Sequence, residues 1–368
     1  MAWVEKRGDG FRVRYRRADG TVGTDSTHPT KTAARTRANA VETEQQQDTY
    51  IDPSSGKITL REWADLWLDA HDVSKGTAAK YQTYLKTHIL PGFGDTPINA
   101  LTRMMVKVWV KDLSQRRAAA TVTDILSVLS MLMGEAVEER RIVINPCRRL
   151  RPSTSHKPER PWATPAQVLA IASHLNPAED TLVITAAYTG MRWGELTGLQ
   201  RHNCKLDDAR IYVDPDEGAL HEIAGKLELG PPKTPAAVRS ILLPPFLVTR
   251  LRDHLGTHDH AHVFVGADGG LYRRSNFSRR YWRPATDGNP DRLIAPVVPG
   301  MHFHDLRHSH KTWMIEDGVP EVAQAKRLGH RLPGVRGIYS HVSPTVEQRL
   351  IDGLQKRWEN TAKPKPDR

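Results

Sequence analysis

The sequence predicts a multidomain, mainly α-helical protein: a small β-sheet-plus-helix N-terminal module, an all-helical domain and a mixed α+β domain. Its 368 residues exceed what one hydrophobic core ordinarily organises. Its composition, 39% apolar and 26% charged, is typical of globular domains. Polar segments that contain proline separate the helical patterns around residues 52–56 and 151–165. We therefore expect domains at residues 1–52, 57–150 and 160–360, followed by a disordered Lys- and Pro-rich tail at residues 361–368.

A short alternating segment defines the N-terminal module. Phe11-Arg12-Val13-Arg14-Tyr15-Arg16 alternates apolar and basic residues, which is the period of a half-buried strand. Ala18-Asp19-Gly20-Thr21 predicts a hairpin turn, and residues 30–47, rich in Ala, Arg and Gln, predict a helix. The face that carries Arg12, Arg14 and Arg16 suits a DNA groove. A strand edge protected by charge would show the same pattern, and the segment alone favours neither interpretation.

The middle of the chain has the apolar spacing of a helical domain. Leu60, Trp63, Ala64, Trp67 and Leu68 recur at helical intervals and predict a helix that faces a core. The segment Pro91-Gly92-Phe93-Gly94 is expected to break the helical pattern, and Asn145-Pro146 to close it. We expect further helices near residues 77–88, 103–113 and 121–140.

The third domain is expected to mix helices with a few short strands. Thr164-Pro165 has the N-cap residue and the first-position proline of a helix start. Strands are predicted at Arg210-Ile211-Tyr212-Val213 and Arg239-Ser240-Ile241-Leu242-Leu243.

Charge and composition narrow the function classes. Lys and Arg outnumber Asp and Glu by 53 to 42, which gives a net charge of +11 and a pI near 9.7. This surplus favours a polyanionic partner, although a basic, well-solvated enzyme would show it too. Only Cys147 and Cys204 are present, which excludes a disulfide framework, and the sequence has no apolar run of eighteen residues and no secretory leader. We expect a cytoplasmic protein with no membrane partner.

Five short segments of the third domain carry side chains suited to phosphodiester chemistry. In order, they are Thr189-Gly190-Met191-Arg192-Trp193-Gly194-Glu195-Leu196, Pro232-Lys233-Thr234, His304-Asp305-Leu306-Arg307-His308, Leu328-Gly329-His330 and Ile338-Tyr339-Ser340-His341. Each is weak alone, since a helical arginine is usually a surface residue and Leu-Gly-His is a common helix end. All five in this order are far more specific.

Together these segments resemble the catalytic set of the tyrosine recombinase, or phage integrase, family: Arg, Lys, His-x-x-Arg, His and Tyr. The resemblance extends over nearly the whole chain. Residues 1–50 resemble an arm-type DNA-binding module, and residues 57–150 resemble a core-binding domain in segments such as Ile89-Leu90-Pro91-Gly92-Phe93-Gly94 and Asn145-Pro146-Cys147. Gln200-Arg201-His202-Asn203 departs from the Arg-Trp-x-Asp-like stretch of many relatives without touching a catalytic position.

The resemblance implies strand breakage and rejoining through a 3′-phosphotyrosine, with Tyr339 as the nucleophile. Arg192 and Arg307 would clamp the anionic phosphate oxygens. A tyrosine hydroxyl, with a pKa around 10, needs a proton acceptor, and His304 is the candidate. Since the covalent link conserves the bond energy, no cofactor, ATP or metal is expected. The sequence contains neither a Walker loop nor an acidic cluster spaced for Mg²⁺.

Other residues have a less certain part in this scheme. Lys233 would protonate the departing 5′-oxygen, with Lys226 as its rival, and His330 would donate a hydrogen bond to the phosphate. Glu195 would support Arg192 and His304, or be a solvated helix charge. Basic residues interleaved with aromatic ones would grip DNA or form a solvated face: Arg273, Arg274, Arg279, Arg280 and Arg283.

Three other hypotheses stay open. A metal-dependent nuclease could use the cluster His302, His304, His308 and His310, but Arg192, Lys233, Arg307 and Tyr339 would then have no role. A catalytically inactive DNA-binding protein on the same scaffold disagrees with the intact set of six residues. A type IB topoisomerase shares the chemistry but would not need an arm module.

The family also implies the partners. They are double-stranded DNA attachment sites of a phage or mobile element, a homotetramer assembled on DNA, and, as further candidates, a directionality factor and a host DNA-bending protein. The segment after Tyr339, near residues 342–358, would reach a neighbouring protomer.

Overall fold

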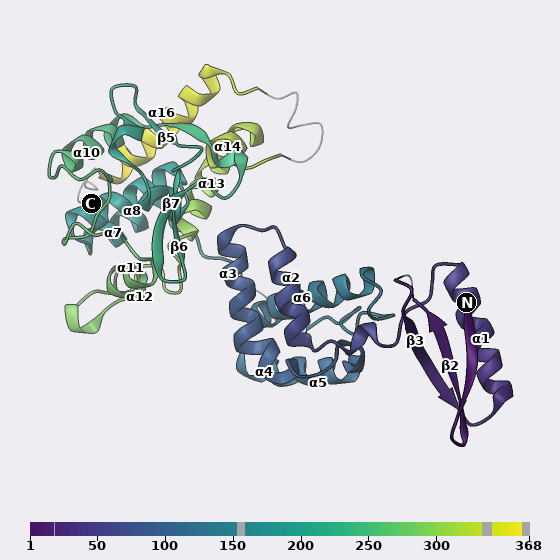
Figure 1. Cartoon of the computed structure of the whole chain (residues 1–368). Helices are drawn as coiled ribbons and strands as arrows, with labels where there is room; N and C mark the ends of the chain where they lie inside the picture. The colour runs from purple at the N-terminus through teal and green to yellow at the C-terminus, as the bar shows by residue number, and fades with distance from the viewer. Residues whose placement is uncertain (18, 153–158, 333–340, 363–368) are drawn as a thin grey trace. The chain divides into compact units, whose positions relative to one another are not determined.

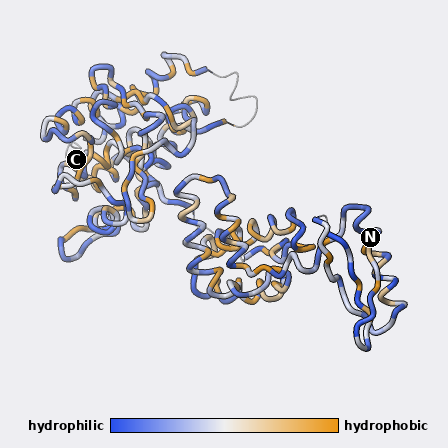
Figure 2. Tube along the Cα trace, in the orientation of Figure 1, coloured by the Kyte–Doolittle hydropathy of each residue, from blue (hydrophilic) through white to orange (hydrophobic). Residues whose placement is uncertain are grey.

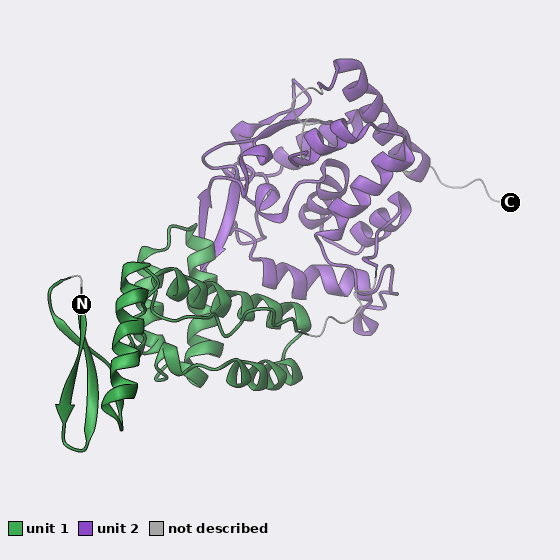
Figure 3. Ribbon diagram, turned by 90° about the vertical axis from the view of Figure 1, so that its right-hand side faces the viewer, with its two compact units in different colours: residues 1–157 green, residues 158–368 purple. Residues whose placement is uncertain are grey.

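The structure, a computed structural model, describes residues 1–17, 19–152, 159–332 and 341–362. It divides into two compact units, residues 1–157 and 158–368 (Figure 3). The first unit holds two separate hydrophobic clusters and the second unit holds one. Helices dominate and the sheets are small (Figure 1), so the predicted fold class is confirmed.

The N-terminal module is a three-stranded antiparallel sheet backed by one helix. Its elements are β1 (Ala2–Arg7), β2 (Gly10–Arg16), β3 (Val22–His28) and α1 (Lys31–Gln46). Val13 and Tyr15 of β2 are buried against α1. Because side chains alternate across a strand, Arg12, Arg14 and Arg16 occupy the opposite face. The predicted strand and helix are therefore confirmed.

A helical bundle forms the rest of the first unit. Its helices are α2 (Leu60–Ala70), α3 (Lys75–Tyr84), the π-helical turn η2 (Leu85–Ile89), α4 (Leu90–Phe93), α5 (Arg103–Arg116) and α6 (Ala119–Glu138). Thr59 caps α2 in a reciprocal arrangement with Glu62. Trp63 is buried, and its indole N–H donates to the Leu132 carbonyl at 2.9 Å. In Figure 2 the helices of this bundle carry both hydrophilic and hydrophobic residues, as expected of helices with one face in a core.

The segment Pro91-Gly92-Phe93-Gly94 ends the helical run as expected, but the run ends at Phe93 and passes through Pro91. The backbone stays helical from α3 through η2 into α4, and Pro91 falls in the first turn of α4. The π-helical turn before it shifts the bonding to i→i−5, as the Leu90 N–H donates to the Leu85 carbonyl. A proline inside a continuous helix removes one backbone donor, and the altered bonding of the preceding π-helical turn is where this helix accommodates it.

Helix α6 has the length and mean hydropathy of a membrane span, judged by length and composition only. Eight of its residues, among them Ile125, Leu129 and Leu132, are buried in the core of the bundle. The same apolar surface therefore serves as the centre of a helical domain.

The second unit surrounds one almost wholly buried helix. Its helices are α7 (Pro165–Ser173), α8 (Pro177–Thr189), α9 (Trp193–Thr197), α10 (Pro245–Leu255), α11 (Arg274–Phe277), α12 (Arg283–Asp287), α13 (Asp305–Glu316), α14 (Glu321–Leu328) and α16 (Pro344–Ala362). Ten residues of α8 are buried, and α7, α10 and α13 pack against it (Figure 1).

Short strands line the second unit. The first sheet joins β4 (Cys204–Lys205), β5 (Arg210–Val213) and β8 (Arg239–Leu242), and confirms both predicted strands. The second is a hairpin of β6 (Ala219–Ile223) and β7 (Lys226–Gly230) that the sequence analysis did not identify. Ala224-Gly225 marks the turn between these two five-residue strands. Both turn residues have positive φ, as a two-residue hairpin turn requires.

Candidate active site

Arg192 caps the start of α9 and is fixed there by Glu195. The Arg192 Nη1 donates to Glu195 Oε1 at 2.7 Å, and the Arg192 backbone N–H donates to Glu195 Oε2 at 3.1 Å. The preceding Gly190 has φ +67, and a Cβ there would lie 2.7 Å from Leu328 Cδ2 and 2.9 Å from His310 Cδ2. Only glycine permits this close approach, which brings the Arg192 turn against the C-terminal end of α14.

Arg307 is held inside the same region by α13. Its side chain donates to the carbonyls of Gly190 and Leu328 and to His330 Nε2, the last at 2.8 Å. Burial, followed by the charges of Arg192 and Arg239, lowers the pKa of Arg307 to about 9. The guanidinium thus stays charged at pH 7 but has lost much of its hydration.

His304 stands one residue before α13. Burial, then the charges of His308, Arg307 and Arg274, lowers the pKa of His304 to about 4. The imidazole is therefore neutral at pH 7, and one of its ring nitrogens can accept a proton.

His330 is presented by the glycine that ends α14. Gly329 has φ +64, and a Cβ there would meet the Ala236 carbonyl oxygen and Ala237 Cα, both at 2.9 Å. Because arginine can only donate, the Arg307 contact makes His330 Nε2 the acceptor and leaves the proton on Nδ1. Burial, then the charges of Arg307 and Arg192, lowers the pKa of His330 to about 4.

The three chain segments converge through shared backbone contacts. Arg192 Nη2 donates to the Gly329 carbonyl at 3.4 Å, while Arg307 bridges Gly190 and Leu328. The structure therefore brings together Arg192, Glu195, Arg307 and His330, with His304 within electrostatic reach.

In the part of the chain that the structure describes, neither Lys233 nor its rival Lys226 makes a hydrogen bond or ion pair with this cluster. Lys233 is exposed in the loop between β7 and β8, three residues after β7 ends. Lys226 is exposed at the start of β7, beside the hairpin tip. Tyr339 lies outside the described residues.

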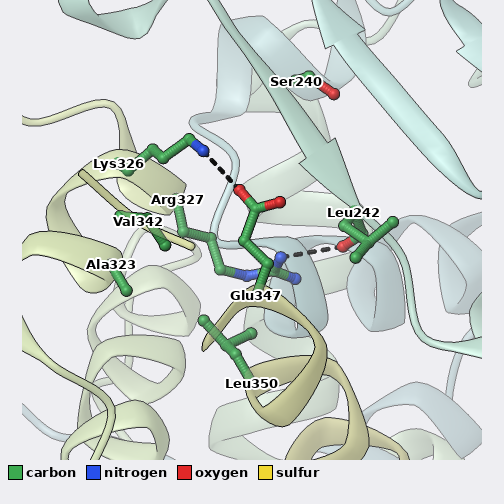
Figure 4. Close-up of a pocket in the computed structure, with 8 residues that line it drawn as sticks. All are labelled: Ser240, Leu242, Ala323, Lys326, Arg327, Val342, Glu347 and Leu350. Atoms are coloured by element: carbon green, nitrogen blue, oxygen red, sulfur yellow. Dashed lines mark hydrogen bonds and ion pairs between the residues drawn. The ribbon is translucent and has the colours of Figure 1, made fainter. Parts of the chain in front are cut away.

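Helix α16, which follows the Tyr339 segment in the sequence, is held by an ion pair to α14. Glu347, in the first turn of α16, accepts from Lys326 of α14 at 2.6 Å and lies 3.5 Å from Arg210. In Figure 4, Glu347 faces Lys326 above Leu350, and Arg327 reaches the Leu242 carbonyl. Helix α16 is therefore anchored to the same helix that presents His330.

One residue of the site, Arg239, was not predicted from the sequence. It joins Glu195 of α9 to the C-terminal end of α14. Its side chain is 5% exposed, and its Nη2 donates to Glu195 Oε2 at 2.9 Å. Its Nε donates to the Arg327 carbonyl at 2.7 Å, two residues before Gly329. Although burial acts to raise it, the charges and hydrogen bonds of Arg239 and Arg192 hold the pKa of Glu195 below its usual value.

A signal for Arg239 existed in the sequence. Arg239, Ile241 and Leu243 alternate along one strand, and Ile241 and Leu243 are buried core residues. A basic residue on the core face of a strand requires a buried anionic partner.

A second buried pair lies below the site. Arg327 donates to His310 Nε2 at 2.9 Å, while His310 Nδ1 bonds the Ala187 carbonyl at 2.9 Å. Burial, followed by the Arg327 charge, lowers the pKa of His310 well below its usual value.

This arrangement does not favour the metal hypothesis. Both ring nitrogens of His310 are engaged, and the rings of His304 and His308 stand 5.5 Å apart, nearly perpendicular. Over residues 1–17, 19–152, 159–332 and 341–362, no three His, Cys, Asp or Glu side chains are arranged to hold a metal ion.

The predicted DNA-binding arginines have different surroundings. Arg273 donates to Glu222 at 3.1 Å and to the Gly225 carbonyl at 2.8 Å, so it holds the β6–β7 hairpin. Arg274, Arg279 and Arg280 are exposed. On the N-terminal sheet Arg16 is exposed, Arg12 and Arg14 are half-buried, and Arg14 lies 3.7 Å from Glu5.

Comparison with known families gives two matches. The model described as the phage integrase family matches residues 161–345, and the model described as the phage integrase N-terminal SAM-like domain matches residues 59–114.

Similar proteins and structures carry related names. An integrase assigned to prophage phiRv2 of Mycobacterium tuberculosis is 29% identical over 320 residues, which cover 84% of this chain and 82% of that protein. The integrase of Mycobacterium phage L5 is 24% identical over 311 residues, with 84% and 82% covered. The Tn1549 transposon integrase in complex with a circular intermediate DNA gives a TM-score of 0.66 at 16% identity, covering 81% of this chain and 99% of that chain. A lambda integrase tetramer bound to a Holliday junction gives 0.57 at 17%, covering 92% and 98%.

Proposed function

This chain belongs to the phage integrase family and is an integrase of the tyrosine recombinase type, and we propose that Tyr339 is the nucleophile with which it breaks and rejoins DNA strands. The observation that carries the proposal is the cluster of cationic and imidazole groups around Arg307. Arg307, His304 and His330 all have lowered pKa values because burial and neighbouring positive charges disfavour their protonated forms. An anionic phosphodiester that enters this cluster would offset that repulsion.

Each side chain then has a role that its surroundings support. Arg192 and Arg307 clamp the two non-bridging oxygens, and charge that develops on those oxygens strengthens both contacts. The neutral imidazole of His304 accepts the proton of the Tyr339 hydroxyl as its oxygen attacks phosphorus. His330 donates through Nδ1, because its Nε2 is occupied by Arg307.

The leaving group is the 5′-oxygen of the cut strand. An alkoxide is a poor leaving group, so a proton donor is needed there, and Lys233 is the candidate with Lys226 as the rival. The products are a 3′-phosphotyrosine and a free 5′-hydroxyl. The reverse attack by a 5′-hydroxyl rejoins a strand without an external energy source.

The proposal extends to domains and partners. Residues 1–52 would bind distal arm sites through Arg12, Arg14 and Arg16, residues 57–150 would bind core DNA, and residues 160–360 would carry catalysis. A relative of this fold forms a tetramer on a Holliday junction, so we propose that four copies act together on duplex attachment sites of a phage or mobile element. A directionality factor and a host DNA-bending protein would bias the outcome, and the protein would act in the cytoplasm.

A nicked suicide duplex that carries the attachment core tests the chemistry. Loss of the short fragment beyond the nick traps the phosphotyrosine, so the wild-type chain should form a covalent adduct that persists in EDTA. Tyr339→Phe should form none. Tyr212→Phe is the matched control, since Tyr212 is a half-exposed tyrosine on β5 of the same unit. An adduct in Tyr339→Phe, or dependence on a divalent metal, would overturn the proposal.

Deletion of residues 1–52 tests the modular part. Binding to arm-site DNA should be lost, while adduct formation on core DNA stays near the wild-type rate. Equal loss of both activities would contradict an independent arm module.

A further inference from the structure

Lys233, the proposed proton donor, has no anchor of its own. Its side chain is exposed, and the residues that the structure describes give its ammonium group no hydrogen bond or ion pair. A lysine carries its charge on a flexible four-carbon stem, so the place of the ammonium group depends on the backbone beneath it. The contacts of the chain on either side of Lys233 therefore determine how well a proton can be delivered.

The hairpin of β6 and β7 fixes the chain upstream of Lys233. Its strand β6 packs against α9, the helix that begins after Arg192. A Cβ on Gly194 would lie 2.7 Å from the Leu220 carbonyl oxygen, and a Cβ on Gly198 would lie 2.5 Å from the Leu220 backbone nitrogen. Because backbone meets backbone at both glycines, β6 is held closely against the helix that positions Arg192.

One side chain connects β6 to the backbone just before Lys233. His221 Nε2 lies 2.9 Å from the Pro231 carbonyl oxygen. A carbonyl oxygen can only accept, so Nε2 carries the hydrogen and donates it. A Cβ on Gly230 would lie 3.2 Å from His221 Cδ2, so the ring lies against the backbone of Gly230. The bond fixes the Pro231 carbonyl two residues before Lys233, and the intervening Pro232 is buried and has a restricted φ.

The chain downstream of Lys233 is held by the short helix η5 (Pro235–Ala237). Ala237 is fully buried, and a Cβ on Gly329 would lie 2.9 Å from the Ala237 Cα. Gly329 ends α14 and presents His330, so η5 lies against the same backbone. The loop that carries Lys233 thus begins at a strand packed on α9 and ends at the terminus of α14.

We propose that His221 is a positioning residue for proton transfer to the 5′-oxygen, because its bond to the Pro231 carbonyl holds the upstream end of the Lys233 loop. The inference rests on the proposed function, in which Lys233 supplies that proton. Without the bond, the loop keeps its downstream anchor only, and the ammonium group samples a larger volume. In the described chain His221 makes no hydrogen bond to Arg192 or Arg307, so its loss should affect protonation of the leaving group and spare the phosphate clamp.

Single-turnover adduct formation at saturating DNA tests this assignment. His221→Phe keeps a ring against Gly230 but has no donor for the Pro231 carbonyl. One neutral hydrogen bond biases a local equilibrium by about 10-fold at most, so this variant should be about 3- to 10-fold slower than the wild-type chain on an ordinary phosphodiester. On a duplex with a 5′-bridging phosphorothiolate, whose thiolate leaving group needs no proton, its rate should match the wild-type rate.

Further variants separate positioning from a general loss of structure. Glutamine places an N–H donor as many bonds from Cβ as the histidine Nε2, so His221→Gln should recover most of the ordinary rate. His258 makes the same kind of bond elsewhere in the unit, from Nε2 to the Val263 carbonyl at 3.2 Å. His258→Phe should therefore keep the wild-type rate per folded molecule. His221→Leu removes the same donor and repeats the test if His221→Phe does not fold.

Two results would overturn the inference alone. One is a His221→Phe rate equal to the wild-type rate on the ordinary phosphodiester, while Lys233→Ala is slow there and recovers on the phosphorothiolate. The other is a His221→Phe defect of equal size on both substrates. Failure of the proposed function would look different, because Lys233→Ala itself would then react at the wild-type rate and Lys233 would not be the proton donor.

Discussion

Replacing Arg239 with methionine removes one of the two arginines that hold Glu195. The methionine side chain has the length of the arginine stem as far as Nε and carries no charge, so it keeps the apolar packing of the stem and removes the guanidinium. The variant loses the 2.9 Å contact to Glu195 and the 2.7 Å contact to the Arg327 carbonyl. Glu195, whose side chain is 2% exposed, keeps only Arg192 as a charged partner.

The contacts allow the effect to be estimated. Removing one partner of a buried ion pair costs about 3–5 kcal/mol. Since Arg192 still compensates Glu195, we expect the lower end, about 3 kcal/mol of unfolding free energy. A domain stable by about 5–15 kcal/mol survives that loss and can be assayed. If Glu195 then draws Arg192 out of place by about 1 Å, cleavage should slow by about 100-fold.

The assay compares two scissile groups in single-turnover adduct formation. On an ordinary phosphodiester, Arg239→Met should be slow. On a methylphosphonate, one non-bridging oxygen is replaced by a methyl group, so the need for two charged clamps falls. If Arg239→Met is slow because Arg192 is misplaced, its rate on the methylphosphonate should be close to that of the wild-type chain. Arg192→Ala should recover on the methylphosphonate in the same way. Arg239→Lys should recover part of the ordinary rate.

The control variant replaces Arg201, an arginine of the same unit that makes structural hydrogen bonds only. Arg201 donates to backbone carbonyls, including Leu255 at 3.1 Å, and contacts none of the predicted catalytic residues. Arg201→Met should lower the unfolding free energy without slowing cleavage by folded protein. If Arg239→Met cleaves at the Arg201→Met rate, or is equally slow on both scissile groups, the positioning argument is refuted.

Three further predictions follow from the same geometry. Lys233→Ala should slow adduct formation by about 100-fold or more. The rate should recover on a 5′-bridging phosphorothiolate, because a thiolate leaving group departs without being protonated. Lys226→Ala should neither slow the reaction nor respond to this substrate, and the reverse pattern would exchange the roles of the two lysines. Gly329→Ala should lose about 2 kcal/mol in chemical denaturation because its φ is positive and its Cβ would meet backbone at 2.9 Å; an unchanged midpoint would contradict this. The pKa of His310 is lower in the folded chain than in the unfolded one, so stability should decline as pH falls below about 6.5. In scanning fluorimetry from pH 7 to 5, His310→Gln should show a smaller decline, and an equal decline would assign the effect elsewhere.

Much of the fold follows from local patterns. Strand β2, helix α2 and strands β5 and β8 could be predicted, because in each the spacing of apolar residues along the sequence matches the face that is buried. The passage of the helical run through Pro91 could not be predicted, because it depends on a π-helical turn that no residue type encodes. The β6–β7 hairpin was missed although Ala224-Gly225 marks its turn.

The site divides in the same way. Arg192, Arg307 and His330 could be selected by motif, and the structure brings them together through Gly190 and Gly329. No motif marks Arg239 or Arg327, and an isolated arginine in a sequence is usually on the surface; only the alternation of Arg239 with the buried Ile241 and Leu243 points to its burial. Their burial depends on carboxylate and carbonyl acceptors that only the folded chain supplies.

The buried cations of the site also imply an order of events. Arg307 and Arg327 both have their pKa lowered to about 9, because burial and neighbouring arginines oppose their charge. Glu195 is the one buried anion among the described contacts of Arg192 and Arg239, so it neutralises only part of that charge. If the site takes the scissile phosphate as proposed, that phosphate supplies the missing anion, and DNA binding should stabilise the second unit as well as align it. The arginines proposed to clamp the transition state would then be only partly compensated until the substrate arrives, which would couple the assembly of the site to the presence of DNA.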